Sequence, residues 1–435
     1  MALLGLIADG VGPFEHLEMD FSDGHGNPHL GPHILAGVNG SGKSTVLRAI
    51  AWAMVGEQFG FNTDEWQHHL QGHPVSRAVL ALKHPSGLPY LQICGRGMES
   101  IDSWNLSSYA DAWGMVAAEI AAKSVDASPM ALPTLPRNTT YRQRIETDGL
   151  MFGLPKDLRL GGPRVNIAGY SPARTLEHIG SPNLTATLRD PNLNALAFEG
   201  TIQNEAIQAW LLSLYSKQAI ARERQQPAHD YTRALDRFES ALRLIYGQEV
   251  RFEVEIEPTL QPRLRIKGQS LNFSQLPDGV RGTVGWIADF MMRQDATKWD
   301  PLLRGKRPGI LLLDEVDAHL HPLWQRRLLP AMREALPDVQ IIVTSHSPFV
   351  ISSCPGSRVH VLEVDEEGRA HNRPPIDATI GESVLTTMKG SSASRAALTS
   401  KPRPNSTSGI ASNARKPCIN SPLTENADSS NSPKP

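Results

Sequence analysis

Short apolar runs separated by turn-forming residues predict strands at the start of the chain. Leu3–Ile7 and Leu17–Phe21 flank a turn that contains glycine and proline, and His33–Ala36 is a further buried strand. Ser44–Val55 follows with apolar residues at helical spacing and ends at Gly56. The sequence therefore predicts a strand, a glycine-rich loop and a helix in direct succession.

The region after Leu276 alternates helices and strands more regularly. Gly309–Leu313 and Val339–Thr344 are continuous apolar runs, which are typical of strands buried on both faces. Strands that alternate with helices predict a mainly parallel sheet flanked by helices, and hence an α/β fold. The other predicted elements of this region are helices at Val280–Met292 and His321–Ala335, a helical turn at Phe349–Ser352 and a last strand at Arg358–Val364.

The middle of the chain is less regular. Val75–Lys83 and Leu88–Cys94 are predicted to pair as a hairpin. Residues 100–160 mix Ser, Pro, Gly and Met without a sustained period, so we interpret them as an irregular insertion. Further on, helices are predicted at Glu199–Ser216 and Tyr231–Tyr246, and a strand pair at Val250–Ile256 and Arg263–Lys267.

The last 50 residues differ in composition from the rest. They are mostly Ser, Asn, Pro, Ala and Lys with almost no bulky apolar side chains, which predicts a disordered tail. We divide the chain accordingly into five parts. These are 1–56, the N-terminal part of the core with the glycine-rich loop; 57–165, an insertion that is partly β and partly irregular; 166–275, a helical segment and a strand pair; 276–385, the C-terminal part of the core; and 386–435, the tail.

Composition narrows the class of protein. The 435-residue chain has a formal net charge of -2, which gives no overall attraction to nucleic acid or to anionic membranes. No run of about 18 apolar residues appears, and the first residues lack the basic segment of a secretion signal. Three cysteines (Cys94, Cys354 and Cys418) lie far apart, as expected for reduced thiols. We therefore expect a cytoplasmic protein with no membrane segment.

Residues 37–45 have the sequence GVNGSGKST, which matches the phosphate-binding pattern G-x-x-x-x-G-K-[S/T]. Glycines let successive backbone N–H groups surround phosphate oxygens, and the following helix adds its positive N-terminal end. Lys43 can reach the outer phosphates of ATP, and the Ser44 hydroxyl can bind Mg²⁺. The alternative is a chance match in a glycine-rich turn, but the strand before it and the helix after it argue against that. The predicted ATP-binding residues of this phosphate loop are Gly37, Asn39, Gly40, Ser41, Gly42, Lys43, Ser44 and Thr45, and Lys43 is also a predicted catalytic residue.

Two carboxylates follow the apolar run 309–313. A buried strand delivers the residues after it to the carboxyl edge of a parallel sheet, beside the phosphates. Asp314 is therefore predicted to hold Mg²⁺, and Glu315 to polarise the attacking water. By itself this pattern fits a core strand that ends in a solvated acidic turn equally well. The phosphate loop favours the catalytic interpretation.

Two further patterns are weaker on local grounds. The strand at 339–344 leads into a polar cluster with His346, which either donates a hydrogen bond to a γ-phosphate or merely caps the strand end. Residues 276–281 (LPDGVR) precede a helix, so Asp278 and Gly279 either face an anion such as ATP or form an ordinary turn and cap. The order of the motifs along the chain favours the functional alternative for both.

Together the motifs resemble those of ABC-type ATPases of the SMC/RecF-like branch, which are AAA-family proteins of bacteria. The strongest similarity lies in residues 313–325 (LDEVDAHLHPLWQ) and 342–348 (IVTSHSP). That branch includes ATPase subunits of anti-phage systems such as Septu and some retrons. Residues 169–174 are also similar to the family, and Tyr170 and Arg174 either pack or act near the nucleotide or the insertion. The resemblance covers residues 1–55 and 165–385 and implies a mainly parallel sheet flanked by helices, with an antiparallel N-terminal β part and a helical or irregular insertion.

The resemblance also implies a head-to-tail homodimer, in which the segment around Pro277 of one subunit closes over ATP in the other. Pro277 departs from the family pattern, because it offers neither a hydroxyl nor an N–H to the opposite γ-phosphate. Gln71 and Gln92 are both candidates for the family's glutamine. Asp317 and residues 319–321 stand where the inter-subunit loop is expected. A zinc site at the two histidines of that stretch is a weaker alternative, because it lacks a third ligand.

The function predicted on this basis is ATP binding and hydrolysis by a dimer that gates a separate effector, such as a nuclease. The expected setting is anti-phage defence or DNA repair, and nucleic-acid binding is left open. One alternative is a transporter-coupled ATPase. Another is a non-hydrolysing, nucleotide-dependent switch or scaffold, which applies if Pro277 prevents closure.

Overall fold

The computed structural model describes residues 2–55, 72–73, 76–83, 89–96, 141–146, 149–151, 166–180, 182–183, 186, 188, 190–227, 229–299 and 303–378. The chain divides into two units, Met1–Thr387 and Met388–Pro435, and every described residue lies in the first. The predicted tail at 386–435, Gln71 and most of the predicted insertion lie outside the described residues.

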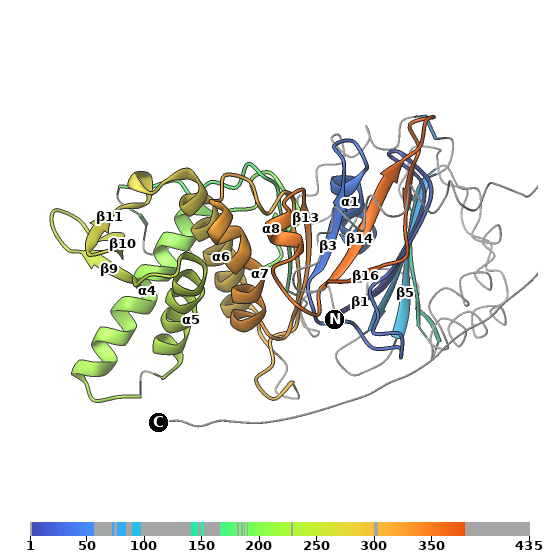
Figure 1. Ribbon diagram of the computed structural model, residues 1–435. Coiled ribbons are helices and arrows are strands. Elements are labelled where there is room, and N and C mark those ends of the chain that lie inside the picture. Colours follow the sequence, from blue (N-terminus) through green and yellow to red (C-terminus); the bar gives the residue numbers. More distant parts are fainter. Residues whose placement is uncertain are drawn as a thin grey trace, which may run out of the picture. The chain divides into compact units, whose positions relative to one another are not determined.

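A mainly parallel sheet forms the centre of this unit (Figure 1). Its strands β8, β12, β13, β3 and β14 lie side by side in this order and run parallel. Two short strands, β15 and β16, pair antiparallel with β14. The bounds are β3 His33–Gly37, β8 Asn166–Tyr170, β12 Gly309–Leu313, β13 Val339–Ser345, β14 Arg358–Val364, β15 Ala370–Asn372 and β16 Ile376–Asp377.

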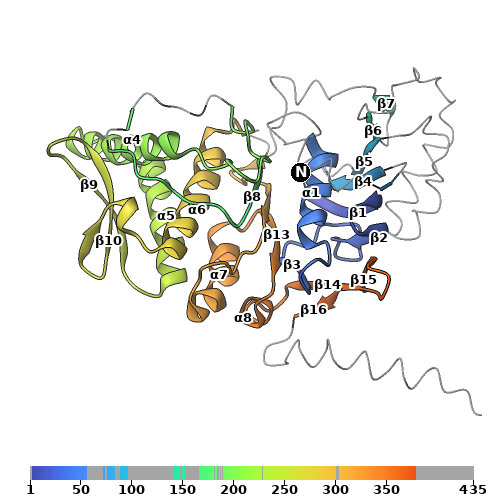
Figure 2. The ribbon, with the colours of Figure 1, turned by 90° about the horizontal axis from the view of Figure 1, so that it is seen from above.

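An antiparallel sheet of order β2-β1-β4-β5-β6-β7 forms the N-terminal β part (Figure 2). The predicted hairpin is confirmed as β4 and β5. By contrast, β6 and β7 fall within residues 100–160, for which the sequence predicts no strand. The bounds are β1 Ala2–Val11, β2 Phe14–Asp20, β4 Ser76–Lys83, β5 Pro89–Arg96, β6 Tyr141–Glu146 and β7 Gly149–Met151.

Helix α1 (Lys43–Val55) contacts both sheets, which explains its composition. Trp52 is 1% exposed, and Leu47 and Ile50 are fully buried. They share one core cluster with Leu80 of β4 and Ile342 of β13. A helix with apolar neighbours on two sides needs apolar residues around most of its circumference rather than along one stripe.

The remaining helices pack against the other face of the parallel sheet, and a small sheet of β9, β10 and β11 lies beside them (Figures 1 and 2). The predicted helices and the predicted strand pair are confirmed. The start of α4 differs from the prediction, because Phe198 and Gly200 have positive φ and interrupt the helical path. The bounds are α4 Asn204–Glu223, α5 His229–Tyr246, β9 Val250–Glu255, β10 Gln261–Ile266, β11 Gln269–Leu271, η3 Phe273–Gln275, α6 Asp278–Ala296, α7 Pro322–Ala335 and α8 Pro348–Ile351.

The predicted fold class is confirmed: an α/β fold with a mostly parallel, helix-flanked sheet and an antiparallel β part. Among the helices that the structure describes, none is long and apolar enough to cross a membrane.

Candidate nucleotide-binding site

Four neighbouring parallel strands bring the predicted motifs to one edge of the sheet. Leu313 of β12 pairs with Val343 of β13 and with Tyr170 of β8, and Ser345 of β13 pairs with Ala36 of β3. The residues that follow these strands therefore emerge together. In open α/β sheets, this carboxyl edge is where ligands bind.

The phosphate loop joins β3 to α1 and is shaped by its glycines. Gly40 and Gly42 have φ values of 82° and 84°, in the left-handed region that other residues rarely adopt. Gly37 lies so close to β14 that an added Cβ would stand 2.4 Å from the Leu362 carbonyl oxygen. No atom lies within 4 Å of a Cβ placed on Gly40, so the backbone is open to a ligand on that side. A phosphate chain fits this cradle.

The Lys43 side chain folds back into its own loop. Its Nζ donates to the carbonyl oxygens of Gly37 at 3.1 Å and Val38 at 2.9 Å, and the residue is 6% exposed. Burial lowers the pKa of Lys43, and the carboxylates of Asp314 and Glu315 oppose this shift. The ammonium is thus placed among the phosphate-loop carbonyls, close to the carboxyl edge of the sheet.

Asp314 is the polar centre of this edge and is 3% exposed. Its Oδ1 accepts hydrogen bonds from Ser44 Oγ at 2.9 Å and from Thr344 Oγ1 at 2.7 Å. Arg48 Nη1 lies 3.5 Å from Oδ2. A hydroxyl and a carboxylate oxygen side by side are the donors that Mg²⁺ prefers, together with phosphate oxygens and water. Ser44 and Asp314 therefore fit the predicted metal site.

That site does not depend on a larger metal-binding cluster. In the part of the chain that the structure describes, no three His, Cys, Asp or Glu residues are grouped to hold a metal ion. The zinc alternative at His319 and His321 accordingly gains no third ligand there.

Glu315 follows directly and has an unusual backbone. Its φ is 43°, in the left-handed region, and its side chain is exposed. Its N–H donates to Thr344 Oγ1 at 2.6 Å. Arg174 donates to the carbonyl oxygen of Glu315 at 2.9 Å and to that of Asp314 at 2.5 Å. An exposed carboxylate on a tightly held backbone lies beside the buried Asp314.

The predicted His346 follows β13 and is exposed. The residues on either side of it are held: Ser345 Oγ donates to Asp317 Oδ1 at 2.6 Å, and Ser347 Oγ donates to Gln325 Oε1 at 2.6 Å. Gln325 Nε2 in turn donates to the Leu320 carbonyl oxygen at 2.9 Å. The two sequence stretches that carry the family resemblance, 313–325 and 342–348, are therefore bonded to each other.

Asp278 and Gly279 lie on a different element, at the start of α6. Pro277 is the N-cap residue and contributes no side-chain hydrogen bond to the helix. The Asp278 side chain is 75% exposed and pairs with Arg281 at 2.5 Å. A Cβ on Gly279 would stand 2.1 Å from the His319 carbonyl oxygen, so the helix start lies against that turn. One chain by itself thus brings together the phosphate loop, Asp314 and Glu315, whereas residues 276–281 are positioned by α6.

Tyr170 and Arg174 both lie in the stretch 169–174 that is similar to the family, but their side chains make different contacts. The Tyr170 hydroxyl donates to Asp289 Oδ2 at 2.7 Å, and burial together with this carboxylate raises the pKa of Tyr170 well above its usual value. Asp289 also pairs with Arg293 inside the protein. Tyr170 is therefore a packing residue, whereas Arg174 contacts the backbone of the candidate site.

Sequence reasoning missed Arg48 and Thr344, both of which contact Asp314. The sequence nevertheless contains a signal for each of these two residues. Arg48 is one helical turn beyond Ser44 and so shares its face of α1. Thr344 ends the strand next to the one that Asp314 follows, so it shares the same sheet edge.

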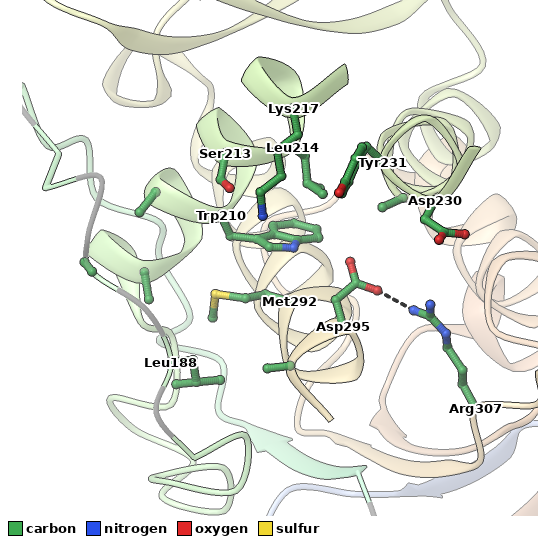
Figure 3. Close-up of a pocket in the computed structure, with 15 residues that line it drawn as sticks. Leu188, Trp210, Ser213, Leu214, Lys217, Asp230, Tyr231, Met292, Asp295 and Arg307 are labelled. Carbon is green, nitrogen blue, oxygen red and sulfur yellow. Dashed lines mark hydrogen bonds and ion pairs between the residues drawn. The ribbon is translucent and has the colours of Figure 1, made fainter. Parts of the chain in front are cut away.

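A separate cavity of about 440 Å³ lies between α4, α5 and α6 (Figure 3). Trp210, Tyr231 and Met292 line it, and an ion pair of Asp295 with Arg307 stands at one side (Figure 3). None of the predicted site residues contributes to its wall. The predicted chemistry is therefore not located in this cavity.

Comparisons with known proteins agree with the motifs. Residues 6–78 match a family described as "AAA domain", and residues 175–352 match "AAA domain, putative AbiEii toxin, Type IV TA system". The chain is 32% identical over 101 residues to the Retron Ec83 probable ATPase of Escherichia coli, which is 23% of this chain and 19% of that protein. It is 37% identical over 65 residues to the Septu protein PtuA of Bacillus thuringiensis, which is 15% of this chain and 16% of that protein.

A solved structure shows the same fold. It is an SMC head bound to the C-terminal winged-helix domain of ScpA, with a TM-score of 0.51 and 12% identity, covering 87% of this chain and 98% of that one. The resemblance to SMC/RecF-like, AAA-family ATPases of the anti-phage type is confirmed. The sequence matches span a fifth or less of the retron and Septu relatives.

Proposed function

We propose that this protein binds ATP with Mg²⁺ at the phosphate loop and hydrolyses it. The hydrogen bond of 2.9 Å between Ser44 Oγ and Asp314 Oδ1 carries this proposal, because it joins the phosphate loop to the acidic strand end. The exposed Glu315 is the next residue. A phosphate chain, a metal ion and a general base thus have adjacent places at one sheet edge.

Each residue has a distinct task in this proposal. The backbone N–H groups of residues 39–45 and the Lys43 ammonium bind the phosphates. Ser44 and Asp314 would hold Mg²⁺, which supplies positive charge for the phosphate oxygens. Glu315 accepts a hydrogen bond from water and orients it toward the γ-phosphorus. The new P–O bond forms as the bond to the β-phosphate oxygen breaks, ADP leaves, and the water proton passes through Glu315 to solvent. His346 donates to the γ-phosphate.

The active form in this proposal is a head-to-tail homodimer. Asp278 and Gly279 of one copy face the ATP of the other. The Asp278 carboxylate is exposed, and its pairing with Arg281 offsets its negative charge. The helix N-terminus supplies N–H groups, because Pro277 supplies neither a hydroxyl nor a side-chain cap. Closure therefore relies on the backbone of α6 rather than on a serine hydroxyl.

The setting follows from the relatives. Their names include a retron probable ATPase and a Septu protein. We accordingly propose a cytoplasmic ATPase whose closure gates a separate effector, such as a nuclease, in anti-phage defence. DNA repair is the other setting compatible with an SMC-like head. Salt-sensitive DNA binding at low ionic strength is the expected sign of a nucleic-acid role.

Phosphate release and dimerisation test the central proposal. Wild type should release phosphate from ATP. Glu315→Gln should still bind ATP but should release phosphate more slowly, by a factor on the order of 10² or greater. ATP should produce a dimer of Glu315→Gln in sedimentation, and Lys43→Ala should lose both ATP binding and this dimer. Absence of turnover by wild type, with ATP bound, would contradict the enzyme assignment.

That last result would favour the second candidate function, a non-hydrolysing nucleotide switch. Pro277 is the observation behind it, because the cap position lacks the hydroxyl that the family pattern supplies. ATP-dependent dimerisation of wild type without phosphate release would distinguish the switch from a protein that does not respond to ATP.

A further inference from the structure

We propose that Arg174 is a positioning residue, which holds the backbone of Glu315 in its catalytic conformation and connects it to helix α6. The proposal rests on the proposed ATPase function. Arg174 itself touches neither substrate nor metal in this scheme. Its effect passes through the acidic turn, which we define as residues 314–317.

The Arg174 guanidinium binds two successive carbonyl oxygens of the acidic turn. Nη1 donates to the oxygen of Asp314 at 2.5 Å and to that of Ser171 at 2.9 Å, and Nη2 donates to the oxygen of Glu315 at 2.9 Å. Arg174 is 7% exposed, so these bonds are shielded from water. A planar fork of donors can hold neighbouring carbonyls in a fixed relation, which a single ammonium cannot.

The acidic turn has a backbone conformation that other groups must stabilise. Glu315 has a φ of 43°, which an L-residue adopts only at an energetic cost. The N–H groups of the turn are bonded by neighbouring strands: that of Asp314 to the Tyr170 oxygen at 2.9 Å and that of Val316 to the Thr344 oxygen at 3.0 Å. Arg174 bonds the carbonyl side. Strands thus fix the N–H side of the turn. On the carbonyl side, Arg174 acts together with the Ala318 N–H, which donates to the Glu315 oxygen at 3.0 Å.

Burial of the guanidinium has its own cost. It lowers the pKa of Arg174 to about 10, and the nearby carboxylates of Asp314, Asp317 and Glu315 oppose that shift. Within the described residues, its hydrogen bonds go to the backbone oxygens of Ser171, Asp314 and Glu315. A buried charge bound mainly to backbone oxygens is a costly way to pack a loop, and it is expected where geometry matters.

Helix α6 packs closely against the backbone of Arg174 because it has glycines on the facing side. Gly279, Gly282 and Gly285 recur every third position, and added Cβ atoms would crowd backbone or side-chain atoms on adjoining segments. At Gly282, the nearest atom is the Arg174 carbonyl oxygen, 3.0 Å from such a Cβ. At Gly279 it is the His319 oxygen, at 2.1 Å. The start of α6 therefore lies against the backbone of Arg174 and against that of His319, two residues beyond the acidic turn.

This contact gives α6 a mechanical route to Glu315. In the proposed dimer, the start of α6 meets the partner's ATP. A displacement of α6 on closure would press on the Arg174 backbone, whose guanidinium sets the Glu315 carbonyl. Arg174 would thereby link closure of its own subunit over the partner's ATP to Glu315, the general base at its own subunit's ATP.

Kinetics of Arg174→Gln, with Tyr170→Phe as the matched control, test the proposal. Arg174→Gln should lower kcat on the order of 10- to 100-fold with little change in KM for ATP, because the phosphate loop is untouched. Arg174→Lys should recover part of kcat. Tyr170→Phe, altered in the same segment but facing Asp289, should lower the thermal midpoint and leave kcat within about twofold.

A second pair of variants keeps the test decisive if Arg174→Gln does not fold. Gly282→Ala crowds the Arg174 carbonyl, whereas Gly285→Ala crowds Leu176 and Ile202 instead. The first should lower kcat more than the second at equal thermal stability. Wild type without turnover would overturn the proposed function itself. Turnover by wild type with an unchanged kcat in Arg174→Gln, or with kcat and ATP affinity falling in step, would overturn only the role of Arg174.

Discussion

Two polar clusters beside the central sheet illustrate opposite uses of buried charge. Around Asp289, every charged group is enclosed: Arg293 donates to the Asp289 carboxylate and to the carbonyl oxygens of Pro191, Leu193 and Thr201, and both members of the ion pair are 0% exposed. At the carboxyl edge, Asp314 is buried while its neighbour Glu315 is exposed.

The difference separates a structural cluster from a candidate reactive one. A closed network leaves no bonding capacity for a ligand, and it stabilises one arrangement of β8, α6 and the segment before α4. The open edge keeps carboxylate and hydroxyl oxygens that a metal ion and phosphates can use. Loss of a partner should therefore cost folding stability in the first cluster and activity in the second.

The largest stability effect is expected from Arg293→Met. Removing one partner leaves the Asp289 carboxylate buried and unpaired, which should lower the free energy of unfolding by about 3–5 kcal/mol. Urea unfolding measures this, and the turnover of the remaining folded protein should be unchanged. Arg265→Met is the control, since its pair with Glu253 lies at the solvent-accessible surface and should contribute little to stability. Equal losses in both variants would contradict the contrast.

The next effect is on activity, in Ser44→Ala. Loss of the hydroxyl that bonds Asp314 should reduce ATP turnover on the order of 10²-fold, because the predicted metal site loses one of its two protein ligands. The free energy of unfolding should change by only about 1 kcal/mol. Ser352→Ala removes a hydroxyl that donates to Pro348 at 2.7 Å and serves as the control. A large stability loss with normal turnover would place Ser44 among the structural residues.

The smallest effect concerns pH and a third buried cluster. His33 Nδ1 and His360 Nε2 lie 3.1 Å apart, and burial lowers the pKa of His33 well below its usual value and that of His360 to about 3. The unfolded chain then binds more protons than the folded protein below about pH 6.5. The free energy of unfolding should therefore keep its full value above pH 6.5 and decrease as the pH is lowered toward 3.

Replacement of His360 sharpens this prediction. The decline in urea midpoint between pH 7 and pH 5 should be shallower for His360→Gln than for wild type. The exposed His25, changed to Gln, should leave the slope as it is. A slope equal in wild type and His360→Gln would show that other groups carry the acid sensitivity.

Two strands of the parallel sheet, one a continuous apolar run and one with apolar residues at most positions, are the most predictable part of the fold. Gly309–Leu313 and Arg358–Val364 have the same bounds in sequence and structure. β8 was not predicted as a strand, because its five residues include Asn166 and Gly169 and show no period. It becomes a strand by pairing with β12 over its whole length. The sequence likewise does not show that α4 begins at Asn204 rather than at Glu199, since nothing local requires a positive φ at Phe198.

The candidate site divides in the same way. The phosphate loop is a continuous segment whose glycines, lysine and serine act through nearby backbone, so residues 37–45 identify it without knowledge of the fold. Asp314 and Glu315 were found because a buried strand carries its last residues to a known edge. The partners of Arg174 could not be found in this way. Its bonds to Asp314 and Glu315 cross 140 and 141 positions of sequence, and only the pairing of β8 with β12 brings those backbone oxygens to the guanidinium.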